Sequence, residues 1–472
     1  MRANYFALRR ATSGRYTITL TIRVGELSMY DLIAAARDKF GELSAAEEEV
    51  VRAAADGEVA YCGADRKNDD PANNPANAAS WGKERTVRAR LIRWLCVDGE
   101  AHRHVDPFGI RIYAAAIGAE EESFDLSSAT ITFPLAFISC KFNAPLALMS
   151  TRLRFFSLEG SHLSELRADG ADVAGSVLLR NGFHIAGDLS FSGAKIEGQL
   201  SFSHAQFNSG SKLVLQNTLV KQAFLWRDLG PDSPVHLDLR DASVGQIADD
   251  EQSWPRKGTL LLDGFVYQRI GEGPRDAGKR LDWLARQPDN FTPQPYRQLA
   301  RVLRESGDDA GARDVLIAME DARLTRGALS ATQRIVHWML RLTVGYGYKP
   351  LRALWYILFL VLLGTSIFSW GHNANVIVEV DRKSIQAYKS FSPFIYSLEH
   401  FLPLVKLGMT EHWVPDPKAT PTPLLFPFSN RVAPAPAKLG TYIQWYLWAH
   451  ILLGWFFTSM LVAGVTGLVK RE

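Results

Sequence analysis

The chain of 472 residues is poor in cysteine, in net charge, and in glycine and proline. Its three cysteines, Cys62, Cys96 and Cys140, show no CxxC spacing, which argues against a disulfide framework or a zinc site. The 36 glycines and 22 prolines are too few for collagen or a low-complexity tract, and a net charge of +3 does not fit a highly charged disordered chain. Most of the chain should therefore fold, with its large N-terminal part in a reducing compartment.

Motifs of known enzymes are also missing from the sequence. It contains no strand followed by GxGxxG, and no P-loop, HExxH, GxSxG or paired-cysteine motif. His102 and His104 share a segment with Glu100 and Asp106, but their spacing favours a solvated polar turn over a metal site. We therefore predict no catalytic residue, metal, cofactor or nucleic-acid partner. The motifs give no support for an oxidoreductase.

The N-terminus does not resemble a signal peptide. Arginines at positions 9, 10, 15 and 23 interrupt its apolar residues, so residues 1–24 contain no continuous apolar core. Residues 16–24 alternate with period two, which predicts an amphipathic strand.

Two long apolar runs lie near the C-terminus, at residues 353–370 and 443–469. At 1.5 Å per residue each is about long enough for the ~30 Å hydrocarbon layer, and aromatics at their ends favour membrane spans over buried core helices. We expect spans at 351–371 and within 443–472, joined by a loop at 372–442. The positive-inside rule then predicts cytoplasmic termini and an exterior loop. For a bacterial chain this loop is periplasmic and the membrane is the inner membrane. Before the first run the basic residues are Arg323, Arg326, Arg334, Arg341, Lys349 and Arg352, and no acidic residue lies between Asp321 and that run. Lys470 and Arg471 follow the second run.

A repeat occupies residues 107–270. A triplet of a small residue, any residue and an apolar residue returns every 10 to 12 residues, and apolar pairs lie between the triplets. Apolar side chains thus recur about every five or six residues, which suits a solenoid whose chain turns after each short strand. A twisted β-sandwich of short strands is the alternative. The triplets begin at Ala129, Cys140, Thr151, Ser161, Ala171, Ala194 and Ala205, and Phe183 with Ile185 fills the remaining position between Ala171 and Ala194.

The segments GDLSFSGAKIEG (187–198) and QLSFSHAQF (199–207) show the repeat most clearly. This pattern resembles the pentapeptide-repeat proteins, and the resemblance implies a right-handed β-helix. The chain has an extra residue per half-coil and little Asn or Asp at the middle position, so we carry over the β-helix but not the tight square cross-section. Two eleven-residue units predict a coil of about 22 residues.

Helices should close the ends of the β-helix, because exposed strand edges need caps. An α/β cap is expected at 1–106, with a capping box of Ser44 and Glu47 at the start of the helix at 44–55 and a second helix at 81–98. Helices at 295–306 and 308–324 resemble a single tetratricopeptide-type pair. With an amphipathic helix at 331–342 they form a connector at 271–350.

The loop between the spans contains a candidate re-entrant segment at 392–408. Ser392 and Pro393 mark the start of a short apolar helix, and a turn rich in Pro and Gly follows it. This layout resembles two-transmembrane pore-loop channels, although the filter sequence is missing; a helix lying on the periplasmic surface is the alternative. The candidate pore residues are Ser392, Glu399, His400, Pro403, Lys406 and Gly408.

The filter-like pentapeptide TVGYG does occur, at 343–347, but it precedes the first span. A filter must follow a pore helix between the spans. We therefore interpret TVGYG as a turn between the amphipathic helix and the membrane.

The second span carries further candidates for pore lining or helix packing. Ser459, Ala463 and Gly467 form a stripe of small residues, which lets another helix approach closely. His450 is an ionisable residue inside an apolar run, and thus a functional candidate unless it only points to the interface beside Trp445 and Trp448.

Two functions remain open at this stage. Two spans alone cannot enclose a pathway, so an ion channel or pore needs a homo-oligomer in the bilayer, with the β-helix as a cytoplasmic sensing or gating domain. The alternative is a membrane-anchored scaffold whose β-helix binds a cytosolic protein or ligand.

Overall fold

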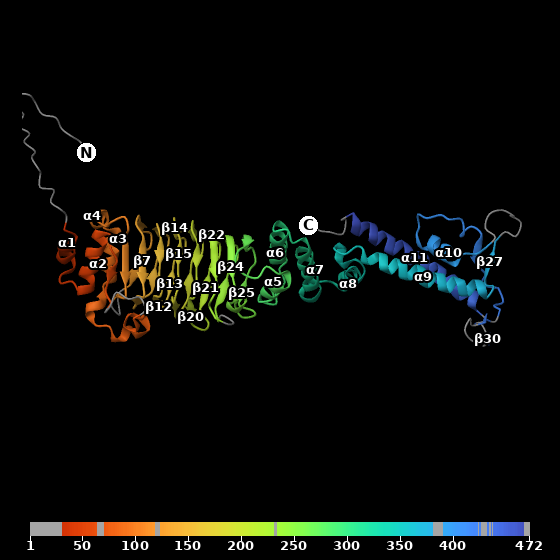
Figure 1. The fold of residues 1–472 in the computed structure, drawn as a ribbon, viewed down its shortest axis with the longest axis horizontal. Helices are drawn as coiled ribbons and strands as arrows, with labels where there is room; N and C mark the ends of the chain where they lie inside the picture. The colour runs from red at the N-terminus through yellow and green to blue at the C-terminus, as the bar shows by residue number, and fades with distance from the viewer. Residues whose placement is uncertain are drawn as a thin grey trace, which may run out of the picture.

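The computed structural model describes residues 31–63, 70–118, 123–230, 234–380, 390–422, 424–425, 432–433, 436 and 438–466. These residues form an elongated molecule in which a helical cap, a β-solenoid, a helical connector and a long pair of helices follow one another (Figure 1). The predicted strand at 16–24, Gly467, Lys470 and Arg471 lie outside the described residues.

The N-terminal cap combines helices with short strands. Ser44 Oγ accepts a hydrogen bond from the Glu47 amide at 3.1 Å and Glu47 Oε2 accepts one from the Ser44 amide at 3.0 Å, so the capping box is confirmed. The helix predicted at 81–98 begins only at Ala89, because residues 86–87 pair with the first coils as a strand. The elements are α1 (Leu32–Phe40), α2 (Ala45–Asp56), β1 (Ala60–Tyr61), η1 (Pro71–Asn73), η2 (Pro75–Ser80), η3 (Lys83–Arg85), β2 (Thr86–Val87), α3 (Ala89–Val97) and α4 (Gly99–Arg103).

The predicted repeat folds as a parallel β-solenoid of about 7 turns. Its strands are β3 (Ile110–Tyr113), β4 (Ala116–Ile117), β5 (Phe124–Asp125), β6 (Thr130–Ile131), β7 (Leu135–Ile138), β8 (Lys141–Phe142), β9 (Leu146–Ala147), β10 (Arg152–Leu153), β11 (Phe156–Ser157), β12 (His162–Leu163), β13 (Leu166–Arg167), β14 (Asp172–Val173), β15 (Val177–Leu178), β16 (His184–Ile185), β17 (Leu189–Ser190), β18 (Lys195–Ile196), β19 (Leu200–Ser201), β20 (Gln206–Phe207), β21 (Lys212–Val214), β22 (Leu219–Trp226), β23 (His236–Asp238), β24 (Ser243–Asp249), β25 (Leu260–Leu261) and β26 (Val266–Ile270).

Four strands make one turn in the regular part of the solenoid. β9 stacks on β5, β10 on β6, β11 on β7 and β12 on β8, each pair parallel and in register. The parallel pairing excludes the β-sandwich alternative. Four strands in each turn are consistent with a pentapeptide-repeat-like β-helix. The predicted right-handedness and cytoplasmic location stay predictions.

Three small hydroxyl residues link successive turns of the solenoid. The hydroxyl groups of Thr151 and Ser161, which begin two of the triplets, and of Thr218 are buried and donate to carbonyl oxygens of the preceding turn, at 2.8 to 3.0 Å. These hydroxyl groups therefore satisfy backbone oxygens that the narrow core removes from water.

The C-terminal end of the solenoid is closed by the helix α5 (Ala277–Leu284). Its residue Arg280 is fully buried and forms a two-pronged ion pair with Asp249, at 2.8 and 2.6 Å. The Trp254 indole donates to the same carboxylate at 2.8 Å. A short 3₁₀ turn, η4 (Glu251–Ser253), lies beside this pair.

The connector and the C-terminal region are mainly helical. α6 (Gln294–Glu305) and α7 (Asp309–Arg326) form the predicted helix pair, followed by α8 (Ala331–Val344) and η5 (Gly345–Gly347). The C-terminal region consists of α9 (Arg352–Asn373), β27 (Ile377–Glu379), α10 (Pro393–Phe401), β28 (Trp413–Pro415), β29 (Leu424–Leu425), β30 (Val432–Ala433) and α11 (Leu439–Val465).

α9 and α11 are long and apolar enough to cross a membrane, with 22 and 27 residues. Only 22% and 17% of their most apolar windows are buried, so they differ from core helices of a soluble protein. Large apolar side chains face outward along both helices. These are Leu354, Trp355, Leu358, Phe359, Leu362, Leu363 and Trp370 on α9, and Tyr442, Trp445, Trp448, Leu452, Leu453, Trp455, Val462 and Val465 on α11.

Candidate functional site

The short helix α10 packs against both long helices, alongside them in Figure 1. Just before α10, Phe391 stacks on His372 near the end of α9, with ring centroids 4.5 Å apart. Further along, Ser397 Oγ donates to the carbonyl oxygen of Val361 at 2.8 Å. Val361 is the tenth of the 22 residues of α9, so α10 reaches from one end of this helix to about its middle.

Glycines make this close approach possible. A Cβ atom on Gly364 would lie 2.4 Å from Ser397 Oγ, and one on Gly454 would lie 1.9 Å from the Phe401 carbonyl oxygen. Both distances are far below van der Waals contact. Glycine in α9 and α11 therefore lets α10 fit between them.

His450 lies at the centre of the three-helix contact and is fully buried. Its Nε2 atom is 3.1 Å from the Ser397 carbonyl oxygen, and its Nδ1 atom is 3.3 Å from the Tyr446 hydroxyl oxygen. These partners fit a neutral imidazole that donates from Nε2 and accepts at Nδ1. His450 thus does not point outward with Trp445 and Trp448, which are exposed; its place is in helix packing.

Glu399 ties α10 to the segment that returns from it. Its carboxylate accepts hydrogen bonds from the amides of Gly408 and Met409, at 3.0 and 2.8 Å, and from the Thr410 hydroxyl at 3.0 Å. The side chain is buried. Glu399 is therefore a structural bridge across the turn, not an open acidic group.

The turn that Glu399 closes, residues 402–408, is the most exposed part of the segment. Leu404 is 87% exposed, and Lys406 and Leu407 are also exposed. β28 then pairs antiparallel with β27, which follows the end of α9. The chain thus runs inward along α10, turns near the middle of the long helices, and returns to the end where it started.

The other predicted site residues take varied positions. Ser392 precedes α10, but its side chain makes no capping hydrogen bond among the described residues. His400 is half-buried against the ring of Tyr396, at 4.4 Å, and Pro403 is half-buried in the turn. Ser459 is exposed and Ala463 half-buried, so these two are not part of the contact with α10.

Sequence reasoning missed Gly364, Ser397, Tyr446 and Gly454. A glycine within each apolar run was a usable signal, because such glycines often mark close helix contacts. Nothing in the sequence paired Val361 or His450 with Ser397, since these two contact residues are 36 and 53 positions from it.

The last three residues of TVGYG, Gly345–Gly347, form the predicted turn between α8 and α9, while Thr343 and Val344 end α8. Tyr346 has a left-handed backbone with φ of 56°, is buried, and donates from its hydroxyl to Asp321 of α7 at 2.8 Å. Burial, followed by the hydrogen bond to Asp321, raises the pKa of Tyr346. Arg341 Nε also contacts Asp321, at 3.2 Å. This segment therefore joins the connector to the long helices.

Among the described residues, no group of three or more His, Cys, Asp or Glu side chains is arranged to hold a metal ion. Comparison with protein-family models, with curated proteins and with solved structures found no match.

Proposed function

We propose that the protein is an oligomeric ion channel or pore in a bacterial inner membrane, with α9 and α11 as its spans and α10 as a re-entrant helix. The outward-facing apolar side chains of both long helices support the membrane placement. The basic residues before α9 support cytoplasmic termini and a cytoplasmic solenoid.

The exposed turn after α10 carries the proposal. Non-helical backbone at membrane depth is tolerated only where protein or a water-filled cavity covers it. In one chain, Leu404, Lys406 and Leu407 of this turn are exposed about halfway along two apolar helices, and Lys406 carries a charge. Neighbouring copies around a water-filled axis would provide that cover, with Lys406 near the pathway.

The connector supplies a route between the solenoid and the spans. Asp321 of α7 contacts both Tyr346 and Arg341, while Lys349 Nζ contacts Asp314 of α7 at 2.9 Å. A displacement of α7 would act directly on the turn that starts α9. The solenoid would thus serve as a sensing or gating domain.

The test is ion flux through the full-length protein in liposomes. Lys406→Glu is expected to change the cation-to-anion preference by about tenfold or more, because a charge near a narrow pathway acts at low dielectric. Lys418→Glu makes the same charge change at an exposed site outside the turn and should leave the preference unchanged.

Mass photometry in nanodiscs measures the oligomeric state as a second test. The proposal expects a single closed oligomer. A monomer that conducts no ions would overturn it and would favour the membrane-anchored scaffold.

A further inference from the structure

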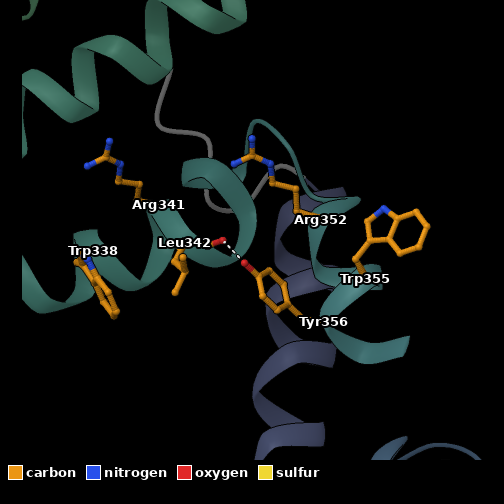
Figure 2. A pocket seen from close by; sticks show the side chains of 6 residues that line it. All are labelled: Trp338, Arg341, Leu342, Arg352, Trp355 and Tyr356. Atoms are coloured by element: carbon orange, nitrogen blue, oxygen red, sulfur yellow. Dashed lines mark hydrogen bonds between the residues drawn. The ribbon is translucent and has the colours of Figure 1, made fainter. Parts of the chain in front are cut away.

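A cavity of about 580 Å³ lies at the elbow where α8 meets α9 (Figure 2). The hydroxyl of Tyr356 donates to the carbonyl oxygen of Leu342 at 3.2 Å, which holds the last turn of α8 against the first turns of α9. The cavity is lined by Trp338, Arg341, Leu342, Arg352, Trp355 and Tyr356.

The charged side chains that line the cavity are both basic. Arg341 comes from α8 and Arg352 from the start of α9, and the described lining contains no carboxylate. Figure 2 shows the two guanidinium groups on either side of the last turn of α8. Arg341 contacts Asp321 through Nε, and its side chain is still 53% exposed. Arginine side chains at one cavity suit a phosphate, because guanidinium groups donate paired hydrogen bonds to its oxygens.

The apolar lining is exposed to the surroundings. Trp355 is 74% exposed and Trp338 56% exposed. α8 continues this surface with further exposed apolar side chains, Ile335, Val336, Met339 and Leu342. An amphipathic helix with tryptophan and arginine at the start of an apolar helix is typical of the level of lipid headgroups.

We propose that this cavity binds the phosphate headgroup of an anionic membrane lipid, with α8 lying in the membrane interface. Arg341 and Arg352 would contact the phosphate, and Trp338 and Trp355 would contact the upper acyl chains. The inference rests on the membrane placement proposed above and not on ion conduction. It identifies a lipid as a ligand of the elbow that joins the connector to the first span.

Lipid retention by the full-length protein tests the proposal. The purified protein is mixed with dioleoyl phosphatidylglycerol or dioleoyl phosphatidylcholine in detergent, and bound lipid is counted by native mass spectrometry. We expect phosphatidylglycerol to be retained more strongly. Arg352→Gln should weaken its retention about tenfold, the effect of losing one hydrogen bond to a charged group.

Arg334→Gln is the matched control. It removes the same charge from the exposed part of α8 without touching the cavity, so retention should be unchanged. Circular dichroism of each variant checks its folding, and Arg352→Lys should retain part of the binding if charge is what matters.

Three results would overturn the proposal: equal retention of both lipids, equal loss in the Arg334 and Arg352 variants, or displacement of the lipid by millimolar inorganic phosphate. Loss of lipid specificity with intact ion flux would reject this inference alone. Absence of flux with intact lipid retention would reject the channel alone.

Discussion

The β-solenoid repeats one kind of contact many times, whereas the contact among α9, α10 and α11 depends on a few side chains that occur once. In the solenoid, Phe156, Val177 and Leu200 stack in register on consecutive turns, and each contacts its equivalents above and below. In the three-helix contact, Ser397, His450 and two glycines belong to no repeat and make their contacts at a single place. In the solenoid, stability is therefore distributed over many equivalent residues. In the three-helix contact, it depends on a few residues.

The end of the solenoid is the first place to test this comparison, since Asp249 and Arg280 form a charged contact next to an apolar core. Arg280→Met should lower the free energy of unfolding by about 3–5 kcal/mol, because it leaves the Asp249 carboxylate buried without its partner. The fluorescence of Trp254 and Trp283, whose rings lie 5.9 and 5.5 Å from the guanidinium carbon, would report urea unfolding.

The double variant Asp249→Leu, Arg280→Met should recover most of this loss, because no charge is left unpaired. Arg301→Met, which breaks an exposed pair with Glu305, should cost less than about 1 kcal/mol. If Arg280→Met and Arg301→Met lowered the free energy of unfolding equally, the buried pair would not be what stabilises the end of the solenoid.

A second test addresses the concentrated contact in the membrane region. Gly454→Leu should destabilise the protein by about 1–3 kcal/mol, because the new side chain would collide with the Phe401 carbonyl and displace α10. Thermal unfolding in detergent would measure this effect. Ser459→Leu is a change of similar kind at an exposed position of α11 and should leave the melting temperature nearly unchanged. Equal melting temperatures for Gly454→Leu and Ser459→Leu would contradict a stabilising contact between α10 and Gly454.

The smallest expected effect is the contribution of His162, on the solenoid, to the pH dependence of stability. Partial burial, followed by the nearby His184 and Lys141, lowers the pKa of His162 to about 4. In the unfolded chain this imidazole binds a proton near pH 6.5, whereas in the folded chain it stays neutral down to about pH 4. Its contribution to the free energy of unfolding is therefore present above pH 6.5 and is lost between pH 6.5 and 4. His162→Gln should reduce the acid destabilisation by about 1 kcal/mol after allowance for solvent screening.

Urea unfolding at pH 7 and pH 4.5 would measure this difference. His236→Gln, at an exposed position of the solenoid, should behave like the parent protein. If His162→Gln lost as much stability between pH 7 and pH 4.5 as the parent protein, His162 would not be a source of the acid destabilisation.

Much of the solenoid could be predicted because its signal is local and repeated. Nearly every strand of the solenoid contributes a buried apolar residue at nearly regular spacing, and this spacing is visible in the sequence. The turn of the chain after each short strand and the coil of about 22 residues follow from the same spacing. The buried pair of Asp249 and Arg280 left no such signal, because its members are 31 positions apart.

For the C-terminal region, the predicted helix after Ser392 matches α10 (Pro393–Phe401), and the two apolar runs match helices of sufficient length. Helical period, apolar runs and end residues are properties of short segments, so the sequence by itself determined these elements and the repeat. Only the tertiary structure decided that His450 faces Ser397, that Glu399 holds the returning turn, and that Arg341 and Arg352 share a cavity. Those contacts join residues distant in the chain, and they form only when helices approach at particular glycines and at a particular elbow.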